Sequence, residues 1–222
     1  MRFIENTVSN FLMPLHQVIT VNHKTQILLW KITESYDELM AQVQLKDKSA
    51  KRLEGMKSEM HRRGFLSVRK LLAQIGYTDF DLHYDATGKP HLQNGTHISI
   101  THSHEFSAII VSDQIVGIDL ELCREKAAVI AHKFVHETES EFMDPADPEY
   151  IQKLTVLWGA KEVIFKIRNE IGISFKDHVR AEPFALRDKQ TLAHLEMDGV
   201  HKTFRVYFET VENFVLVFAF EA

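Results

Sequence analysis

Cysteine is almost absent from this sequence. Cys123 is the only one in 222 residues, which excludes an internal disulfide framework and a metal cluster built from cysteines. Long apolar runs are missing as well, since no stretch approaches the roughly 18–20 residues that a membrane-spanning helix needs. The opening segment, MRFIENTVSNFLMPLHQ, contains no uninterrupted apolar core of signal-peptide length. We therefore expect a soluble, cytoplasmic protein with no membrane partner.

A strong excess of one charge is also missing. Lysine and arginine number 26 against 31 aspartates and glutamates, which leaves a net charge of −5. That balance argues against general nucleic-acid binding, because a nucleic-acid partner calls for a basic surface. The hydrophobic fraction of 45% is that of an ordinary globular protein, and the length allows one domain or two small ones.

The hydrophobic pattern predicts helices and antiparallel strands in both halves of the chain. The expected helices cover 35–45, 48–75 (with a possible break at Gly64), 127–142, and a segment beginning at Asp147 with Pro148 as its first helical residue. The expected strands cover 27–32, 96–101, 106–112, 115–121, 203–209 and 214–220. Residues 105–111 faintly echo 212–218. The sequence thus predicts an α+β protein with two similar lobes, 1–115 and 116–222, each a helix packed on a small antiparallel sheet.

Two carboxylates share one face of the strand VGIDLEL, residues 116–122. Asp119 and Glu121 stand two residues apart, so both side chains project to the same side. Neighbouring negative charges repel and raise each other's pKa. The simplest interpretation is that the two acids lie on the solvent-exposed face of an edge strand, and these seven residues alone favour that wet-face interpretation.

A second charged pair interrupts an apolar helix stripe. In the helix after Asp147, the stripe reaches Trp158 and then meets Glu162, with Lys166 one turn later. A surface ion pair at this spacing stabilises a helix by only a few tenths of a kcal/mol. Charges in line with an apolar stripe are costly to bury unless they are paired or metal-bound. The pattern therefore favours a functional site over a surface ion pair that only stabilises the helix.

Histidines follow the strand within THISITHSHE, residues 96–105. His102 and His104 have the spacing of a zinc pair, but a zinc site needs further ligands and no cysteine lies nearby. His102 beside the Thr101 hydroxyl also suits a phosphate. A surface histidine near a turn is an equally open interpretation.

These stretches occur in the order of a known pattern. Gly88-Lys89-Pro90, then Ser99-Ile100-Thr101-His102-Ser103, then Gly117-Ile118-Asp119-Leu120-Glu121, then Trp158 through Lys161-Glu162 to Lys166 resemble the GKP, (N/S)ISHS, GIDIE and WxxKExxxK blocks of the 4′-phosphopantetheinyl transferase superfamily. The length is similar to that of its long, pseudo-dimeric subgroup. Thr101 stands where the family usually has serine.

The resemblance implies an enzyme that transfers 4′-phosphopantetheine from coenzyme A to a serine of an apo acyl or peptidyl carrier protein. It implies Mg²⁺ held by Asp119, Glu121 and Glu162. Glu162, Lys166 and His102 are the expected catalytic residues. The expected coenzyme A ligands are Lys89, Thr101, His102, Lys161 and, on a looser match, Arg52. Two lobes in one chain suggest a monomer.

Two other functions remain open at this point. A degenerate homologue could bind carrier proteins without transfer, although Asp119, Glu121, Glu162 and Lys166 are all present. A Mg²⁺-dependent phosphohydrolase could use the same three acids. Neither the carrier protein nor its pathway follows from the sequence.

Overall fold

The structure is a computed structural model that describes residues 15–222. These residues form two compact units, which we call the first lobe, ending at Gln114, and the second lobe, beginning at Ile115. Most of the opening segment considered above lies outside the described residues. Each lobe combines helices with an antiparallel sheet, so the expected α+β class with two sheet-bearing lobes is confirmed.

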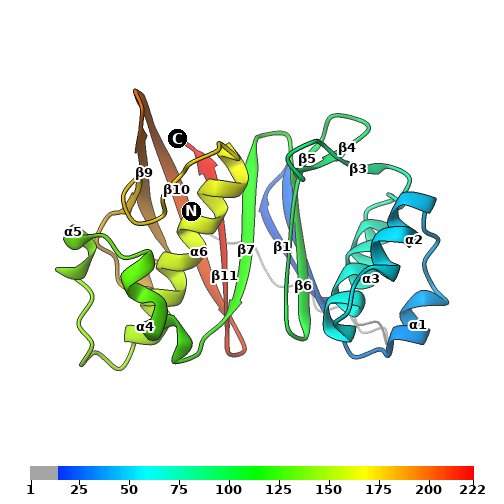
Figure 1. Cartoon of the computed structure of the whole chain (residues 1–222), viewed down its shortest axis with the longest axis horizontal. Coiled ribbons are helices and arrows are strands. Elements are labelled where there is room, and N and C mark those ends of the chain that lie inside the picture. Colours follow the sequence, from blue (N-terminus) through cyan, green and yellow to red (C-terminus); the bar gives the residue numbers. More distant parts are fainter. Residues whose placement is uncertain (1–14) are drawn as a thin grey trace. The chain divides into compact units, whose positions relative to one another are not determined.

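The first lobe has a four-stranded sheet in the order β1-β2-β6-β5, in which every neighbouring pair is antiparallel. Helix α3 packs on this sheet against β6, β2 and β5 (Figure 1). A separate hairpin, β3-β4, lies against β5. The elements are β1 (Leu15–Asn22), β2 (Thr25–Lys31), α1 (Tyr36–Met40), α2 (Asp47–Glu54), α3 (Glu59–Gln74), β3 (Leu82–Tyr84), β4 (Pro90–Leu92), β5 (His97–Ser103) and β6 (Phe106–Ser112).

The second lobe has a five-stranded sheet in the order β7-β11-β10-β9-β8, again antiparallel throughout. The long helix α6 covers β7 and β11, as Figure 1 shows. The elements are β7 (Val116–Leu122), α4 (Lys126–Ile130), the 3₁₀ turn η1 (Ala131–Lys133), α5 (Glu137–Ser140), α6 (Tyr150–Arg168), β8 (Val179–Ala181), the 3₁₀ turn η2 (Leu186–Asp188), β9 (Gln190–Met197), β10 (Val200–Val211) and β11 (Phe214–Glu221).

The helical stretch expected over 48–75 is two helices, but the break is not at Gly64. Helix α2 ends at Gly55, and α3 begins after Ser58, whose side chain accepts a hydrogen bond from the His61 backbone N–H. Gly64 stays inside α3. Its missing side chain is used for packing, because a Cβ there would lie 3.1 Å from Cγ of His102. The sequence also predicted that this helical stretch ends before Gly76. This is confirmed, since Gly76 follows α3 with a φ of +80°.

Two helix boundaries in the second lobe differ from expectation. The segment 127–142 breaks into α4, η1 and α5, because His136 and Glu139 form a capping box that starts a new helix. Helix α6 begins at Tyr150 rather than at Pro148. The Asp147 carboxylate accepts from the Glu149 N–H and pairs with Lys153, which makes a turn ahead of the helix.

The strands β6 and β7 follow each other at hairpin spacing but do not pair. β6 pairs with β2 and β5, whereas β7 pairs with β11. The short connection at 113–115 therefore carries the chain from one sheet to the other. In the second lobe it delivers β7 to the sheet edge beside α6, which positions the acidic strand.

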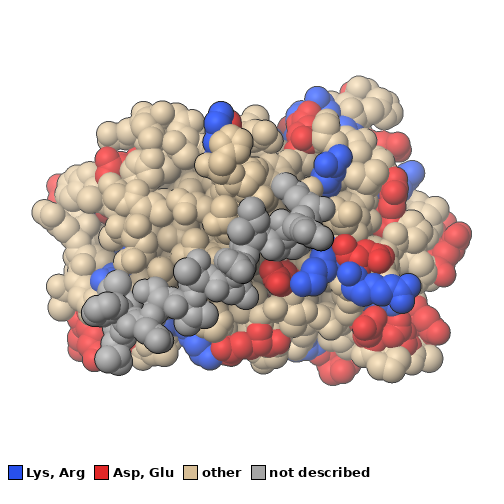
Figure 2. All heavy atoms as spheres, turned by 180° about the vertical axis from the view of Figure 1, so that it is seen from behind, with Lys and Arg blue, Asp and Glu red and all other residues tan. Residues whose placement is uncertain are grey.

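Within residues 15–222 no helix combines the length and the apolar character needed to cross a bilayer. On the face of the molecule shown in Figure 2, basic and acidic side chains of the described residues lie intermingled.

Candidate active site

The acids of β7 face helix α6. A Cβ at Gly117 would lie 2.5 Å from the Val163 carbonyl oxygen of α6, so this side of the strand points at the helix. Asp119 and Glu121 project to the same side as Gly117, and Asp119 is only 4% exposed. β7 is an edge strand, but the wet-face interpretation is wrong because α6 covers that face.

Small residues allow the helix to lie this close. A Cβ at Gly159 of α6 would approach Cγ2 of Val217 on β11 to 2.6 Å and Oδ2 of Asp119 to 3.8 Å. A contact of 2.6 Å is shorter than van der Waals packing permits, so a side chain at 159 would force the helix away from the sheet. The short distance between α6 and the acidic strand depends on this glycine.

Lys166 reaches from α6 to the acidic strand. Its Nζ lies 2.8 Å from Oδ1 of Asp119 and 2.8 Å from the Ile118 carbonyl oxygen. The sequence suggested Glu162, one turn earlier, as its ion partner. The direct partner in the structure is Asp119 instead, while the Lys166 charge still lowers the pKa of Glu162.

The three carboxylates affect one another electrostatically. Burial raises the pKa of Glu121 to about 7, with further contributions from the charges of Asp119 and Glu162. A Trp158 side-chain hydrogen bond and the Lys166 charge oppose this rise. Burial and the Asp119 charge also raise the pKa of Glu162. Asp119, Glu121 and Glu162 therefore form one negative cluster that a cation would stabilise.

No metal site is formed as the side chains stand: within residues 15–222, no three His, Cys, Asp or Glu side chains are arranged so that they could hold an ion. This includes His102 and His104. The acid cluster nevertheless fits Mg²⁺ in its chemistry, because Mg²⁺ prefers carboxylate oxygens together with substrate phosphates. Beyond the effect of burial, the charges of neighbouring acids raise the pKa of Glu121 and of Glu162, and a cation would offset that repulsion.

A pocket opens beside the acid cluster. It has a volume of about 200 Å³, and Glu121 and Trp158 are part of its wall. Its other walls combine apolar side chains with two cations and one hydroxyl: Leu122, Ala127, Ile130, Phe134, Arg124, Lys126 and Thr155. A ligand that reaches the acids could extend an uncharged chain into this space.

Lys161 lies apart from the acid cluster. Its side chain is completely buried, and its Nζ contacts Glu139 and three backbone carbonyls. The sequence suggested a coenzyme A ligand at this position. Coenzyme A has no access to an enclosed ammonium group, and the partners of Lys161 are internal instead.

In the first lobe, Lys89 sits in the turn of the β3-β4 hairpin. The carboxylate of Asp85 accepts hydrogen bonds from the backbone N–H groups of Thr87 and Lys89. Its other oxygen lies 2.9 Å from Nε2 of His91. Gly88 supplies the φ of +88° that this turn requires. The turn is held rigidly around Asp85, and it presents Lys89 from a fixed backbone.

Thr101 and His102 lie on β5. Thr101 is buried and His102 is exposed. The His102 ring packs over Gly64 of α3 and lies 5.9 Å from the ring of His61. The exposed ring is therefore fixed in direction by the helix beneath it.

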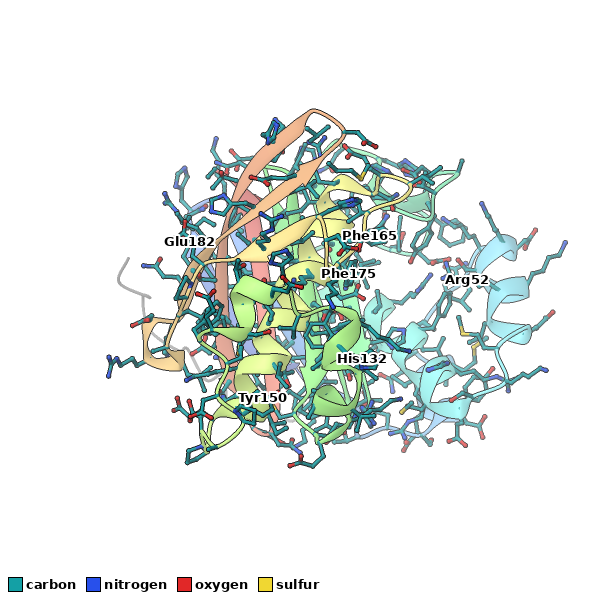
Figure 3. The ribbon with its side chains drawn as sticks, turned by 60° about the vertical axis from the view of Figure 1, so that its left-hand side comes forward. Arg52, His132, Tyr150, Phe165, Phe175 and Glu182 are labelled. Atoms are coloured by element: carbon teal, nitrogen blue, oxygen red, sulfur yellow. The ribbon has the colours of Figure 1, made fainter. Side chains whose placement is uncertain are left out.

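Arg52 lies on α2 (Figure 3). Its guanidinium group stacks 5.0 Å from the ring centre of Tyr84 and 5.8 Å from that of Phe65. Tyr84 is the last residue of β3, so Arg52 lies against the hairpin that carries Lys89.

The raised pKa of Glu121 predicts how stability depends on pH. A carboxyl whose folded pKa of about 7 exceeds its usual 4.5 binds its proton more tightly in the folded state. This stabilisation is complete below the unfolded pKa and is lost as pH rises through about 7. Without divalent cations, we expect Glu121→Gln to raise the melting temperature at pH 8 and hardly at pH 4. Equal changes at both pH values would contradict the assignment. Glu196→Gln, on the exposed face of β9, is the control.

Two important positions were missed in the sequence. Glu139, the partner of Lys161, and Gly159 were given no role from the sequence. A pairing across 22 residues leaves no periodic signal. A glycine within an otherwise apolar helix stripe signals a close contact, and that signal was available.

Comparisons with known proteins find similarity in the second lobe. Residues 115–218 match the family model described as the 4′-phosphopantetheinyl transferase superfamily. A 4′-phosphopantetheinyl transferase, gsp, of Aneurinibacillus migulanus is 32% identical over 107 residues, which cover 46% of this chain and 45% of that protein. The match thus spans about half of each chain. Asp119, Glu121, Glu162 and Lys166 all lie inside the matched segment, and it is this segment, residues 115–218, that is similar to the 4′-phosphopantetheinyl transferase superfamily.

Proposed function

We propose that the protein transfers the 4′-phosphopantetheine group from coenzyme A to a serine of an apo-carrier protein in the cytoplasm, as a monomer that depends on Mg²⁺. The observation that carries this proposal is the cluster of Asp119, Glu121 and Glu162 between β7 and α6, with Lys166 at its edge. The family match of the second lobe and the name of the matched relative support it.

Asp119, Glu121 and Glu162 are the residues that would hold Mg²⁺. When bound, the ion would neutralise charge on the pyrophosphate of coenzyme A. Burial raises the pKa of both Glu121 and Glu162, and the charges of the neighbouring acids raise it further; a bound cation would offset that repulsion.

In the proposed transfer, the serine oxygen of the carrier forms a bond to the phosphorus of the pantetheine phosphate. The phosphoanhydride bond breaks, and adenosine 3′,5′-bisphosphate leaves with the bridging oxygen. Glu162 accepts the serine proton, for which its raised pKa is suited. Lys166, with only part of its side chain exposed, stabilises the charge that develops on the leaving phosphate.

The pocket beside Glu121 is proposed to take the pantetheine arm. That arm carries amides and methyl groups, which fits a wall in which apolar side chains alternate with polar ones, two of them the cations Arg124 and Lys126. If the pantetheine arm enters the pocket past Glu121, its phosphate end lies beside the carboxylates of Asp119, Glu121 and Glu162.

Lys89, Thr101 and His102 of the first lobe are proposed to hold coenzyme A phosphates, together with Arg52. We expect Lys89→Ala and His102→Ala to weaken coenzyme A binding. Each charge-assisted hydrogen bond is worth about 1.5–3 kcal/mol, which corresponds to roughly tenfold to hundredfold in dissociation constant. Calorimetric titration measures this directly.

Two controls sharpen that measurement. His97→Ala changes an exposed histidine on the same strand as His102, and Lys48→Ala changes an exposed lysine of α2; both should bind coenzyme A like the wild type. Titration with dephospho-coenzyme A identifies a residue that contacts the 3′-phosphate. Unchanged affinity for both ligands in Lys89→Ala and His102→Ala would contradict the phosphate-binding role.

The function itself is tested by incubating the protein with coenzyme A, Mg²⁺ and a panel of apo acyl and peptidyl carrier proteins. The proposal requires that at least one carrier gains the mass of phosphopantetheine. Free phosphopantetheine without a modified carrier would indicate a phosphohydrolase. Carrier binding without either product would indicate a non-catalytic homologue.

A further inference from the structure

The buried ammonium group of Lys161 is bonded on every side to this chain. Its Nζ lies 2.7 Å from Oε2 of Glu139, and neither side chain has any exposed surface. It also donates to the carbonyl oxygens of Phe134 at 2.6 Å, Phe175 at 2.9 Å and Val179 at 2.7 Å. Lys161 therefore joins α6 to three segments that are distant from it in the sequence.

Glu139 is held as completely. Its Oε2 accepts from the His136 backbone N–H at 2.8 Å, in addition to Lys161. Its Oε1 accepts from the backbone N–H of Ala181 at 2.8 Å. The carboxylate thus links α5 to β8, and the ion pair connects α5, α6 and β8 through side chains that solvent does not reach.

The same connections hold the aromatic wall of the pocket, which consists of Phe134 and Trp158. Phe134 and Phe175, whose carbonyls bind Lys161, both contact Trp158, with ring centres 5.2 Å and 5.4 Å away. Phe175 also contacts Phe165 of α6 at 5.9 Å, and Figure 3 shows these two rings side by side. Trp158 in turn makes the side-chain hydrogen bond to Glu121.

A buried ion pair is a weak source of stability, because both charges lose their hydration and apolar residues of similar size often serve as well. Its geometry is more demanding than that of an apolar contact, since each hydrogen bond fixes a direction. Helix residues follow one another at about 100° around the axis. Holding the three N–H donors of Lys161 among four oxygen acceptors therefore fixes the direction of Glu162, the next residue.

We propose that Lys161 and Glu139 are positioning residues, whose buried ion pair fixes the rotation of α6 and the aromatic wall so that Glu162 and Trp158 face the acids of β7. This inference rests on the proposed transfer reaction. It replaces a direct coenzyme A-binding role for Lys161 with an effect exerted through Glu162, so it predicts a loss in turnover rather than in coenzyme A affinity.

The test is the variant Lys161→Met/Glu139→Gln, which removes both charges and nearly keeps the volumes. We expect kcat to fall about tenfold to hundredfold, the range for a misplaced catalytic group, while KM for coenzyme A stays within about twofold. The control is Lys153→Met/Asp147→Asn, which removes an ion pair near the start of the same helix, and its kcat should be that of the wild type. Wild-type kcat in the first variant, or a large rise in KM with kcat retained, would overturn the inference.

A second variant and a second measurement keep the test decisive. If the double variant does not fold, Glu139→Gln alone should lower kcat severalfold at unchanged KM, and wild-type kinetics would overturn the inference. Amide hydrogen exchange at 158–162 should accelerate more than exchange in β9 and β10; an unchanged or uniform pattern would also overturn it. Because exchange needs no carrier protein, selective acceleration in a protein that transfers nothing would refute the proposed function and leave the positioning role standing.

Discussion

Glu162→Gln is expected to reduce transfer to carrier proteins by about a thousandfold or more, the upper range for losing one group that stabilises the transition state. Glutamine keeps the size of the side chain but neither accepts the serine proton nor supplies a charged ligand for Mg²⁺. The fold should survive, because removing the Glu162 charge relieves a repulsion that adds to the effect of burial and of Asp119 on the pKa of Glu121. We expect a slightly higher melting temperature without divalent cations.

Mass spectrometry of the carrier after timed incubation measures this loss. Asp119→Asn should behave similarly in the assay, since Asp119 belongs to the same cluster. Glu149→Gln, an exposed position at the start of α6, is the matched control and should transfer like the wild type. Near-full Mg²⁺-dependent transfer by Glu162→Gln would mean that the acids have another role.

Lys166→Met is expected to lower turnover by about two orders of magnitude, on the scale of losing one electrostatic stabiliser. Methionine keeps the apolar stem and the helix propensity of lysine, so the charge is the main difference. The affinity for coenzyme A should change much less, because the proposed contact strengthens only as charge develops on the leaving phosphate.

The contact between Lys166 and Asp119 adds two measurable consequences. Without the ammonium group, the buried Asp119 loses its ion partner, so the melting temperature should fall at neutral pH in the absence of Mg²⁺. Mg²⁺ alone should bind the variant more tightly, because Lys166 no longer competes for Asp119. Lys153→Met on the same helix is the control. Wild-type turnover in Lys166→Met would make this lysine a structural counter-ion only.

The candidate site was predicted from sequence only in part by its patterns. Glu162 interrupts an apolar stripe and therefore indicates a functional site, whereas Asp119 and Glu121 alone favour a solvent-exposed strand face. The three acids were assigned to one site by the resemblance to the transferase superfamily. The partner of Lys166 was not visible: an i,i+4 spacing pointed to Glu162, whereas the Nζ reaches Asp119, 47 residues away. Contacts across elements depend on how closely a helix approaches a sheet, and periodicity does not report that distance.

The fold was predictable to a similar extent. The alternating strands and the α+β class follow from hydrophobic periods, and the stop at Gly76 follows from its freedom to adopt a positive φ. The three-residue connection between β6 and β7 is typical of a hairpin, and only the division into lobes at 115/116 predicted that these two strands belong to different sheets. Likewise, 127–142 has the composition of one helix, but the capping box at His136 and Glu139 starts another.

Gly159 has a consequence for anyone who wishes to make the protein more heat-resistant. Replacing a glycine inside a helix by alanine is a standard stabilising substitution, worth about 1 kcal/mol from helix propensity. In α6 the added methyl carbon would lie 2.6 Å from Cγ2 of Val217, so the helix would have to shift away from β11. That shift would also carry Glu162 away from Asp119. A thermostability screen that measures only folding would accept variants at this position in which the gain in helix propensity offsets the loss of packing. In those variants the distance between Glu162 and Asp119 would nevertheless have changed.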